Sequence, residues 1–243
     1  MMVDIEVMKL SGKKSYWPII LKIYDSHFEW FQLNIRLVPV YIQFRNQRKT
    51  QIPNFPEMEE YLNLMLKARE ILVSESHEEV AMVIDHLFKR QDSEEYKTSR
   101  ALYDICVSCN PGCLTLKLLK VYQSSSNGIL RLRSISQLSE TLTYLKNQIV
   151  FSKFSLDSLY EIKPLLILCL TMQETKESDI KILRKIVSFV TYNVVELHKD
   201  KWDELGDCIL SLASSKEPVK AFHVFIDLPP VYKSFIDNFL DKS

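Results

Sequence analysis

From residue 56 to the end of the chain, apolar residues recur every three or four positions, which is the repeat of one face of an α-helix. Val80, Val83, Ile84 and Leu87 follow this spacing, and similar stretches recur throughout the rest of the sequence. Short polar segments separate these stretches, and no β-strand is required to explain any of them. The pattern therefore predicts about ten helices and no strand over residues 56–243.

Residues that commonly begin helices precede most of these stretches. Ser76 with Glu79, and Asp92 with Glu95, have the three-residue spacing of a capping box at the start of a helix. Asn110–Pro111 predicts an N-cap residue followed by proline at the first helical position. We expect a further helix over residues 155–171, kinked or split at Pro164, because proline lacks the N–H of an interior helical residue. Other expected boundaries are Ser124–Gly128, Ser178–Asp179, Asp200, Glu217–Pro218 and Pro229–Pro230.

The connections between the predicted helices are short, so successive helices are expected to be antiparallel neighbours. Several helices, such as the one predicted over residues 180–197, are apolar on more than one side and need cover from two neighbours. These features predict an all-α fold, an α-solenoid of antiparallel helix pairs, with a compact bundle as the alternative. The expected units start near residues 57, 92, 126, 155 and 200.

The composition of the chain changes near residue 55. Residues 1–55 are rich in aromatic side chains and carry eight Lys and Arg against four Asp and Glu. A helix is expected over residues 18–31, whereas the pattern of residues 35–44 leaves their secondary-structure type ambiguous. The segment Pro53–Pro56 interrupts helical structure, because each proline disfavours helix in the residue before it. We therefore divide the chain into an aromatic, basic segment, residues 1–55, and a helical-repeat domain, residues 56–243.

Composition narrows the class of protein further. The 31 basic and 31 acidic residues leave no net charge, and only four glycines occur in 243 residues. The N-terminal residues lack the apolar core of a secretory signal, and no apolar run approaches the roughly 20 residues that span a bilayer. Five cysteines, an odd number, fit reduced thiols. The expectation is a cytoplasmic or nuclear protein without a membrane partner.

Cys106, Cys109 and Cys113 form the one cluster with a spacing typical of metal ligands. A closed zinc site needs a fourth ligand, and no histidine or further cysteine lies nearby in sequence. The first two cysteines share a stripe with apolar neighbours, where cysteine behaves as a small buried side chain. We expect core packing here, as at Cys169 and Cys208, and neither a metal nor a cofactor.

The sequence offers no recognisable catalytic site. The histidines do not form the His-Glu-x-x-His pair of zinc enzymes, and the isolated glycines form no phosphate-binding loop. Asp85 and His86 are adjacent, so on a helix their side chains point in different directions. Surface or helix-end positions are expected for His27, His77, His86, His198 and His223, and for the carboxylates Glu57, Glu59, Glu60, Glu78 and Glu79. We predict a protein that is not an enzyme and has no small-molecule substrate.

Nucleic-acid binding is an alternative function. The basic residues Arg45, Arg48, Lys49, Arg131 and Arg133 have the charge needed to contact phosphates. Lys and Arg alternate with Asp and Glu on nearly every predicted helix, however, so solvated helix faces are the simpler explanation. We expect a protein partner rather than a nucleic acid.

Three stretches resemble known helical repeats. The sequence from Arg131 to Leu138 resembles the basic second helix of a HEAT repeat. Trp202, Leu205, Gly206 and Ile209, followed by Ala221, Phe225 and Pro229, resemble a tetratricopeptide unit, which makes an adaptor of that class a second alternative. From Tyr61 onward the chain resembles a plant family catalogued as domain of unknown function 577, in the segments SHEEVAMVIDHLFKRQDSEEY, CLTLKLLKVYQSSSNG, MQETKESDIKILRKIVSFV, WDELGDCILSLASS and KAFHVFIDLPPVY.

The last resemblance implies an armadillo- or HEAT-like fold and carries no assigned activity or catalytic residue. Together with the absence of a catalytic motif, it leads us to predict a non-enzymatic protein–protein interaction module or scaffold. The sequence does not identify the interacting residues.

Overall fold

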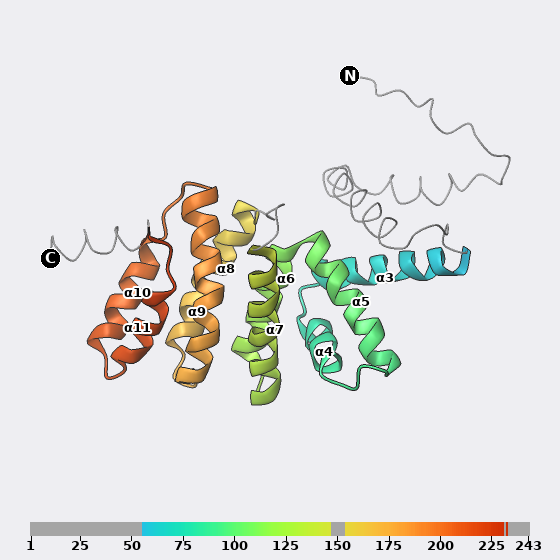
Figure 1. The fold of residues 1–243 in the computed structure, drawn as a ribbon, viewed down its shortest axis with the longest axis horizontal. Helices are drawn as coiled ribbons and strands as arrows, with labels where there is room; N and C mark the ends of the chain where they lie inside the picture. Colours follow the sequence, from blue (N-terminus) through green and yellow to red (C-terminus); the bar gives the residue numbers. More distant parts are fainter. Residues whose placement is uncertain (1–54, 147–153, 231, 233–243) are drawn as a thin grey trace, which may run out of the picture. The chain divides into compact units, whose positions relative to one another are not determined.

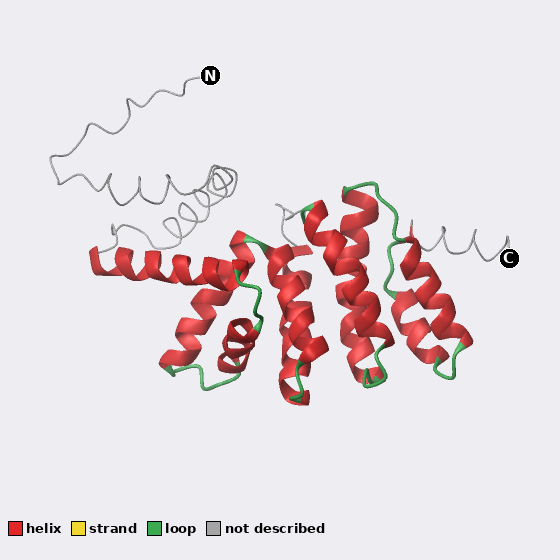
Figure 2. Cartoon of the chain, turned by 180° about the vertical axis from the view of Figure 1, so that it is seen from behind, coloured by secondary structure: helices red, strands yellow, loops and turns green. Residues whose placement is uncertain are grey.

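The computed structural model describes residues 55–146, 154–230 and 232, all within the unit formed by residues 52–243. Over these residues the chain forms nine α-helices and one π-helical segment, and no strand (Figure 2). The prediction of an all-α fold is thereby confirmed for the described part of the chain. The expectations for residues 1–54 and for the segment after Pro229–Pro230, apart from Pro230 and Tyr232, lie outside the described residues.

The helices follow one another with short connections. Their bounds are α3 Phe55–Val73, α4 Glu78–Leu87, α5 Glu94–Cys109, α6 Pro111–Ser124, α7 Gly128–Lys146, α8 Leu156–Thr171, α9 Glu177–Thr191, the π-helical segment η2 Tyr192–Leu197, α10 Asp203–Ser214 and α11 Pro218–Ile226. None of these described helices is both long enough and apolar enough to cross a lipid bilayer.

From α6 onward, helices that are two apart in sequence pack side by side. Helix α6 contacts α7 and α8, α8 also contacts α10, α7 contacts α9, and α9 contacts α11 (Figure 1). One layer therefore contains α6, α8 and α10, and a second layer contains α7, α9 and α11, with α4 beside α7. Before them, α5 packs against both α3 and α4. This alternation between two layers is the α-solenoid of antiparallel pairs that the sequence predicts, and not a compact bundle.

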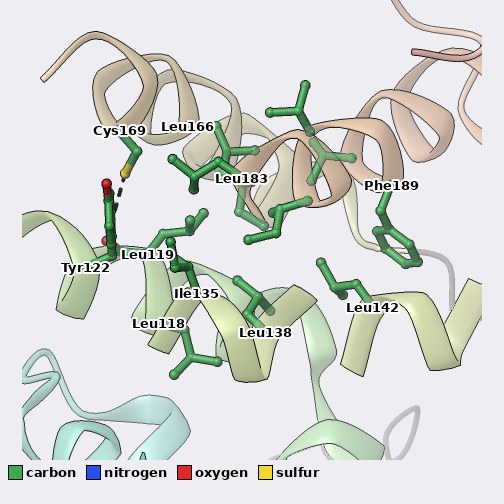
Figure 3. Close-up of a cluster of buried hydrophobic side chains, with 14 of the residues drawn as sticks. Leu118, Leu119, Tyr122, Ile135, Leu138, Leu142, Leu166, Cys169, Leu183 and Phe189 are labelled. Atoms are coloured by element: carbon green, nitrogen blue, oxygen red, sulfur yellow. Dashed lines mark hydrogen bonds between the residues drawn. The ribbon is translucent and has the colours of Figure 1, made fainter. Parts of the chain in front are cut away.

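The core lies between the two layers. Leu118 and Leu119 of α6, Ile135 of α7, Leu166 of α8 and Leu183 of α9 are all fully buried, and their side chains meet in one cluster (Figure 3). Similar buried residues continue along the described helices, so each helix is covered by the helices before and after it. Burial of such side chains is the main favourable term that holds the pairs together.

Two of the predicted helix starts are wrong. Helix α4 begins at Glu78 after His77, which makes no side-chain cap bond, and the hydroxyl of Ser76 accepts from the N–H of Glu78. The Nζ of Lys117 binds the carbonyl of Ser76 at 2.8 Å and thereby holds the segment before α4. At α5 the cap is Ser93, one residue later than expected, because the predicted cap residue Asp92 forms an ion pair with a neighbouring arginine.

Other predicted boundaries are confirmed. The Oδ1 of Asn110 accepts from the N–H of Cys113 at 2.9 Å, and α6 starts with proline. Ser155 caps α8, which continues through Pro164 as one helix, so of the kink or split predicted at this proline the split does not occur. Glu217–Pro218 begins α11 as predicted.

The helix predicted to continue to Leu197 changes its winding near the end. Helix α9 starts at Glu177, and from Tyr192 to Leu197 the chain forms a π-helix. The buried side chain of Asn193 lies within this segment, and His198 directly follows the segment. Both side chains bind the backbone of Phe154. A 3.6-residue hydrophobic repeat does not reveal a π-helical turn, and such turns commonly mark special contacts.

Candidate interaction surface

The three clustered cysteines face helix α3. The thiol of Cys106 points to the carbonyl of Ala68 at 3.8 Å, and the thiol of Cys113 to the carbonyl of Leu72 at 3.0 Å. Burial raises the pKa of Cys106 to about 12 and raises the pKa values of Cys109 and Cys113 as well. The thiols therefore stay protonated near neutral pH and pack α5 and α6 onto α3. Over the described residues, no three or more His, Cys, Asp or Glu side chains group in a way that could hold a metal ion.

One serine–histidine contact resembles part of a catalytic arrangement. The Oγ of Ser124 lies 2.7 Å from Nε2 of His77 and 2.7 Å from the carbonyl of Lys120. A hydroxyl has one proton, and with that proton donated to the carbonyl of Lys120, Ser124 accepts from an N–H of the imidazole. The contact instead joins the start of α4 to the end of α6.

The other described histidines are bound to groups of the chain itself or lie at helix ends. His198 donates to the carbonyl of Phe154, and His223 lies 3.2 Å from Glu177. His86 lies in the last turn of α4, where a cation suits the helix dipole. Its neighbour Asp85 binds Arg133 instead, so these adjacent residues form no catalytic pair. His27 lies outside the described residues.

The two arginines considered for nucleic-acid contacts are engaged within the chain. The guanidinium of Arg131 stacks 4.8 Å from the ring centre of Tyr122. Arg133 lies 2.8 Å from a carboxylate oxygen of Asp85 and stacks 4.8 Å from the ring centre of Phe88. Arg45, Arg48 and Lys49 lie outside the described residues.

An exposed apolar stripe runs along α8. Leu156, Tyr160 and Leu168 are 57%, 81% and 45% exposed, and Pro164 between them is exposed as well. Residues four apart lie on one face of a helix, so these four side chains form a continuous line, which we call the α8 stripe. The opposite face of α8, including Ile162, is buried in the core.

The proline of the α8 stripe adds a polar feature to it. Because Pro164 has no N–H, the carbonyl of Tyr160, four residues earlier, lacks its usual helical donor. The side chain of Tyr160 is 81% exposed, so an aromatic ring is accessible in the middle of the α8 stripe.

Acidic side chains accompany the α8 stripe on α8 itself and on α10, its neighbour in the same layer. We call this set the acidic rim; it consists of the exposed residues Asp157, Glu161, Asp203, Glu204 and Asp207. None of the ion pairs within the described residues includes any of these five carboxylates. The single cation of α8 and α10, Lys163, is mostly buried and binds the carbonyl of Lys201 at 3.0 Å, with Asp200 at 3.6 Å. The five carboxylates of the acidic rim therefore have no ion-pair partner among the described residues, although the exposed Lys201 lies two residues before Asp203.

A second pair of exposed apolar residues offers a comparison. Val219 and Phe222 on α11, the α11 pair, are 51% and 60% exposed. The charged groups on α11 are paired, because Lys220 binds Glu217 at 2.6 Å and His223 lies near Glu177. The α11 pair thus resembles the α8 stripe in exposure, but the charged groups of α11 itself are paired.

Sequence reasoning did not identify the α8 stripe. The four-residue spacing from Leu156 to Leu168 is readable, but the helix predicted over residues 155–171 is apolar on several sides. Periodicity alone therefore does not reveal which side faces solvent. That choice is made by the packing of α8 against α6, α9 and α10.

The comparisons with known proteins identify one segment. Residues 159–242 match the family described as "Repeat of unknown function (DUF577)", a match that runs from the second turn of α8 through α11. No curated protein and no solved structure matches the chain. The resemblance to this family of unknown function is thus confirmed for the C-terminal segment, whereas the armadillo or HEAT type and the plant origin stay predictions.

Proposed function

We propose that the chain, whose residues 159–242 carry this repeat of unknown function, is a non-enzymatic interaction module that binds a protein partner through the α8 stripe. The observation that supports the proposal is the line of four exposed apolar residues on one helix face. An apolar surface bounded by polar residues is typical of a protein-binding site, and solenoids commonly present helix surfaces to partners.

Charge favours a protein over a nucleic acid as the partner. The carboxylates of the acidic rim repel phosphate groups, whereas Arg131 and Arg133 already contact groups of the chain. Nucleic-acid binding would require a basic surface that the described residues do not supply near the α8 stripe. The alternative of a tetratricopeptide-like adaptor concerns the class of repeat and predicts a protein partner as well.

The proposal is tested by affinity capture with the full chain. Wild type, L156S/Y160S and the matched control V219S/F222S are immobilised and exposed to an extract of the organism that makes the protein. We expect wild type and V219S/F222S to retain a common set of proteins that L156S/Y160S fails to retain. Equal retention by all three proteins, or no reproducible retention by wild type, would contradict the proposal.

A further inference from the structure

We infer that the occupant of the α8 stripe is a basic amphipathic helix of the partner protein, with apolar residues on one face and Lys or Arg beside them. This inference rests on the proposed function and specifies the chemistry of the partner. It follows from the combination of an exposed apolar line with carboxylates that form no ion pair among the described residues.

The dimensions of the α8 stripe suit a helical ligand. From Leu156 to Leu168 the stripe covers about 18 Å, or about three helical turns at 1.5 Å per residue. A partner helix of similar length can place apolar side chains at intervals of three and four residues against it. The core of the contact would then be Tyr160, the most exposed member of the stripe.

The charge of the surface selects a basic ligand. Asp157 and Glu161 lie three residues before Tyr160 and Pro164 on α8, so they are beside the stripe. The contact of Lys163 with the carbonyl of Lys201 holds the start of α10, with its three carboxylates, beside the middle of α8. Opposite charges across an interface favour encounter and exclude partners of the wrong sign, so acidic helices, nucleic acids and anionic membranes are disfavoured.

The centre of the stripe can bind a cation directly. The face of the exposed Tyr160 ring attracts Lys and Arg. An Arg or Lys of the partner helix can stack on this ring while its neighbours contact the acidic rim.

The inference is tested by fluorescence anisotropy with the full chain and a designed amphipathic helix of Leu and Lys, about 18 residues long. Two further peptides are compared: one with Glu in place of every Lys, and one with the same Leu and Lys in an order that is not amphipathic. Wild type is expected to bind the first peptide at least about tenfold more tightly than either comparison peptide. Equal or tighter binding of the Glu peptide, or of the peptide without amphipathicity, would overturn the inference.

Protein variants locate the binding site. L156S/Y160S should weaken binding of the Leu–Lys peptide at least about tenfold, and the isosteric variant E161Q/D207N about threefold to tenfold with a smaller salt dependence. V219S/F222S should bind like wild type. Unchanged affinity in L156S/Y160S, or equal losses in L156S/Y160S and V219S/F222S, would overturn the inference. All substitutions are at exposed positions, and circular dichroism verifies that each variant keeps its helical content.

The two tests fail in distinguishable ways. If the extract contains proteins whose retention depends on the α8 stripe but the Leu–Lys peptide does not bind, the proposed function is supported and the basic helix is rejected. If no retained protein depends on the stripe, the proposed function itself is contradicted.

Discussion

The side-chain Oδ1 of Asn193 accepts a hydrogen bond from the backbone N–H of Phe154 at 3.0 Å, across 39 residues of sequence. The Nδ2 of the same side chain donates to the carbonyl of Phe189 at 3.2 Å, and the ring of His198 binds the carbonyl of Phe154 at 2.6 Å. Asn193 of η2 and His198, directly after η2, thus satisfy both backbone groups of Phe154. This contact fixes the chain where it enters α8 and so orients the α8 stripe.

Replacing Asn193 by alanine should therefore destabilise the fold. The N–H of Phe154 would remain buried without an acceptor, at a cost of about 2 kcal/mol in the free energy of unfolding. Urea unfolding followed by circular dichroism measures the difference. The control is the exposed Gln123→Ala, which should change stability by less than about 0.5 kcal/mol. A loss in the Asn193 variant no larger than in this control would show that the contact is dispensable.

Alkaline pH should destabilise the protein because buried acids resist ionisation. Burial raises the pKa of the Tyr103 phenol above its ordinary value and raises the pKa of the Cys169 thiol to about 12. The unfolded chain loses these protons near pH 10 and near pH 8.5, respectively, while the folded chain keeps them. The unfolded state then binds fewer protons, so the free energy of unfolding falls as pH rises, starting near pH 9.

A tyrosine variant isolates one contribution to this pH dependence. Tyr103→Phe should make the loss of stability above about pH 10 shallower, by up to about 1.4 kcal/mol per pH unit. Unfolding curves between pH 8 and about pH 11 measure the slope, and Tyr144→Phe at an exposed position is the control. Identical slopes for wild type and Tyr103→Phe would contradict the prediction.

Helices α6 and α8 approach each other closely at Gly112. A Cβ atom placed on Gly112 would lie 2.8 Å from the Cβ of Ser158, whereas one placed on Gly128 would meet nothing within 4 Å. Gly112→Ala should therefore destabilise the fold by about 1–3 kcal/mol, and adding Ser158→Gly should restore part of that loss. Gly128→Ala should be neutral or slightly stabilising. Thermal unfolding compares the variants; equal effects of the two alanines would contradict the close approach.

The cap of α5 can be tested by comparing two adjacent residues. Ser93 accepts a hydrogen bond from the N–H of Tyr96 at 3.2 Å, whereas Asp92 forms an exposed ion pair with Arg90. Ser93→Ala should cost about 1 kcal/mol of stability, and Asp92→Ala less than about 0.5 kcal/mol. If urea unfolding showed a larger loss of stability for Asp92→Ala than for Ser93→Ala, Asp92 rather than Ser93 would be the cap.

The sequence predicted most of the fold because helical spacing and short connections leave few arrangements. The start of α6 at Asn110 and Pro111 was predictable, since an N-cap residue followed by proline acts locally. The starts of α4 and α5 were not, because Lys117 binds the backbone carbonyl of Ser76 before α4, and Asp92 pairs with Arg90 instead of capping α5. Local propensity competes there with contacts that only the folded chain provides.

The candidate site was less predictable than the fold. The spacing of the α8 stripe is present in the sequence, but the neighbours of α8 decide which apolar face is hidden. Whether the carboxylates of the acidic rim are paired also depends on where the neighbouring cations bind. Lys163, for example, binds the carbonyl of Lys201 and lies near Asp200. Tertiary packing decides which face of α8 is buried and which charged groups pair, and a hydrophobic pattern in the sequence does not reveal either.

The central claim, that a partner protein binds along the α8 stripe, is tested most directly by site-specific photocrosslinking. Benzoylphenylalanine is placed at Tyr160 or, as the matched control, at Phe222 of the full chain, which is then illuminated in a native extract. Both positions are exposed, so they differ chiefly in their surroundings. We expect discrete crosslinked proteins from position 160 and not from position 222. The same products in equal yield from both positions, or none from position 160, would contradict the claim.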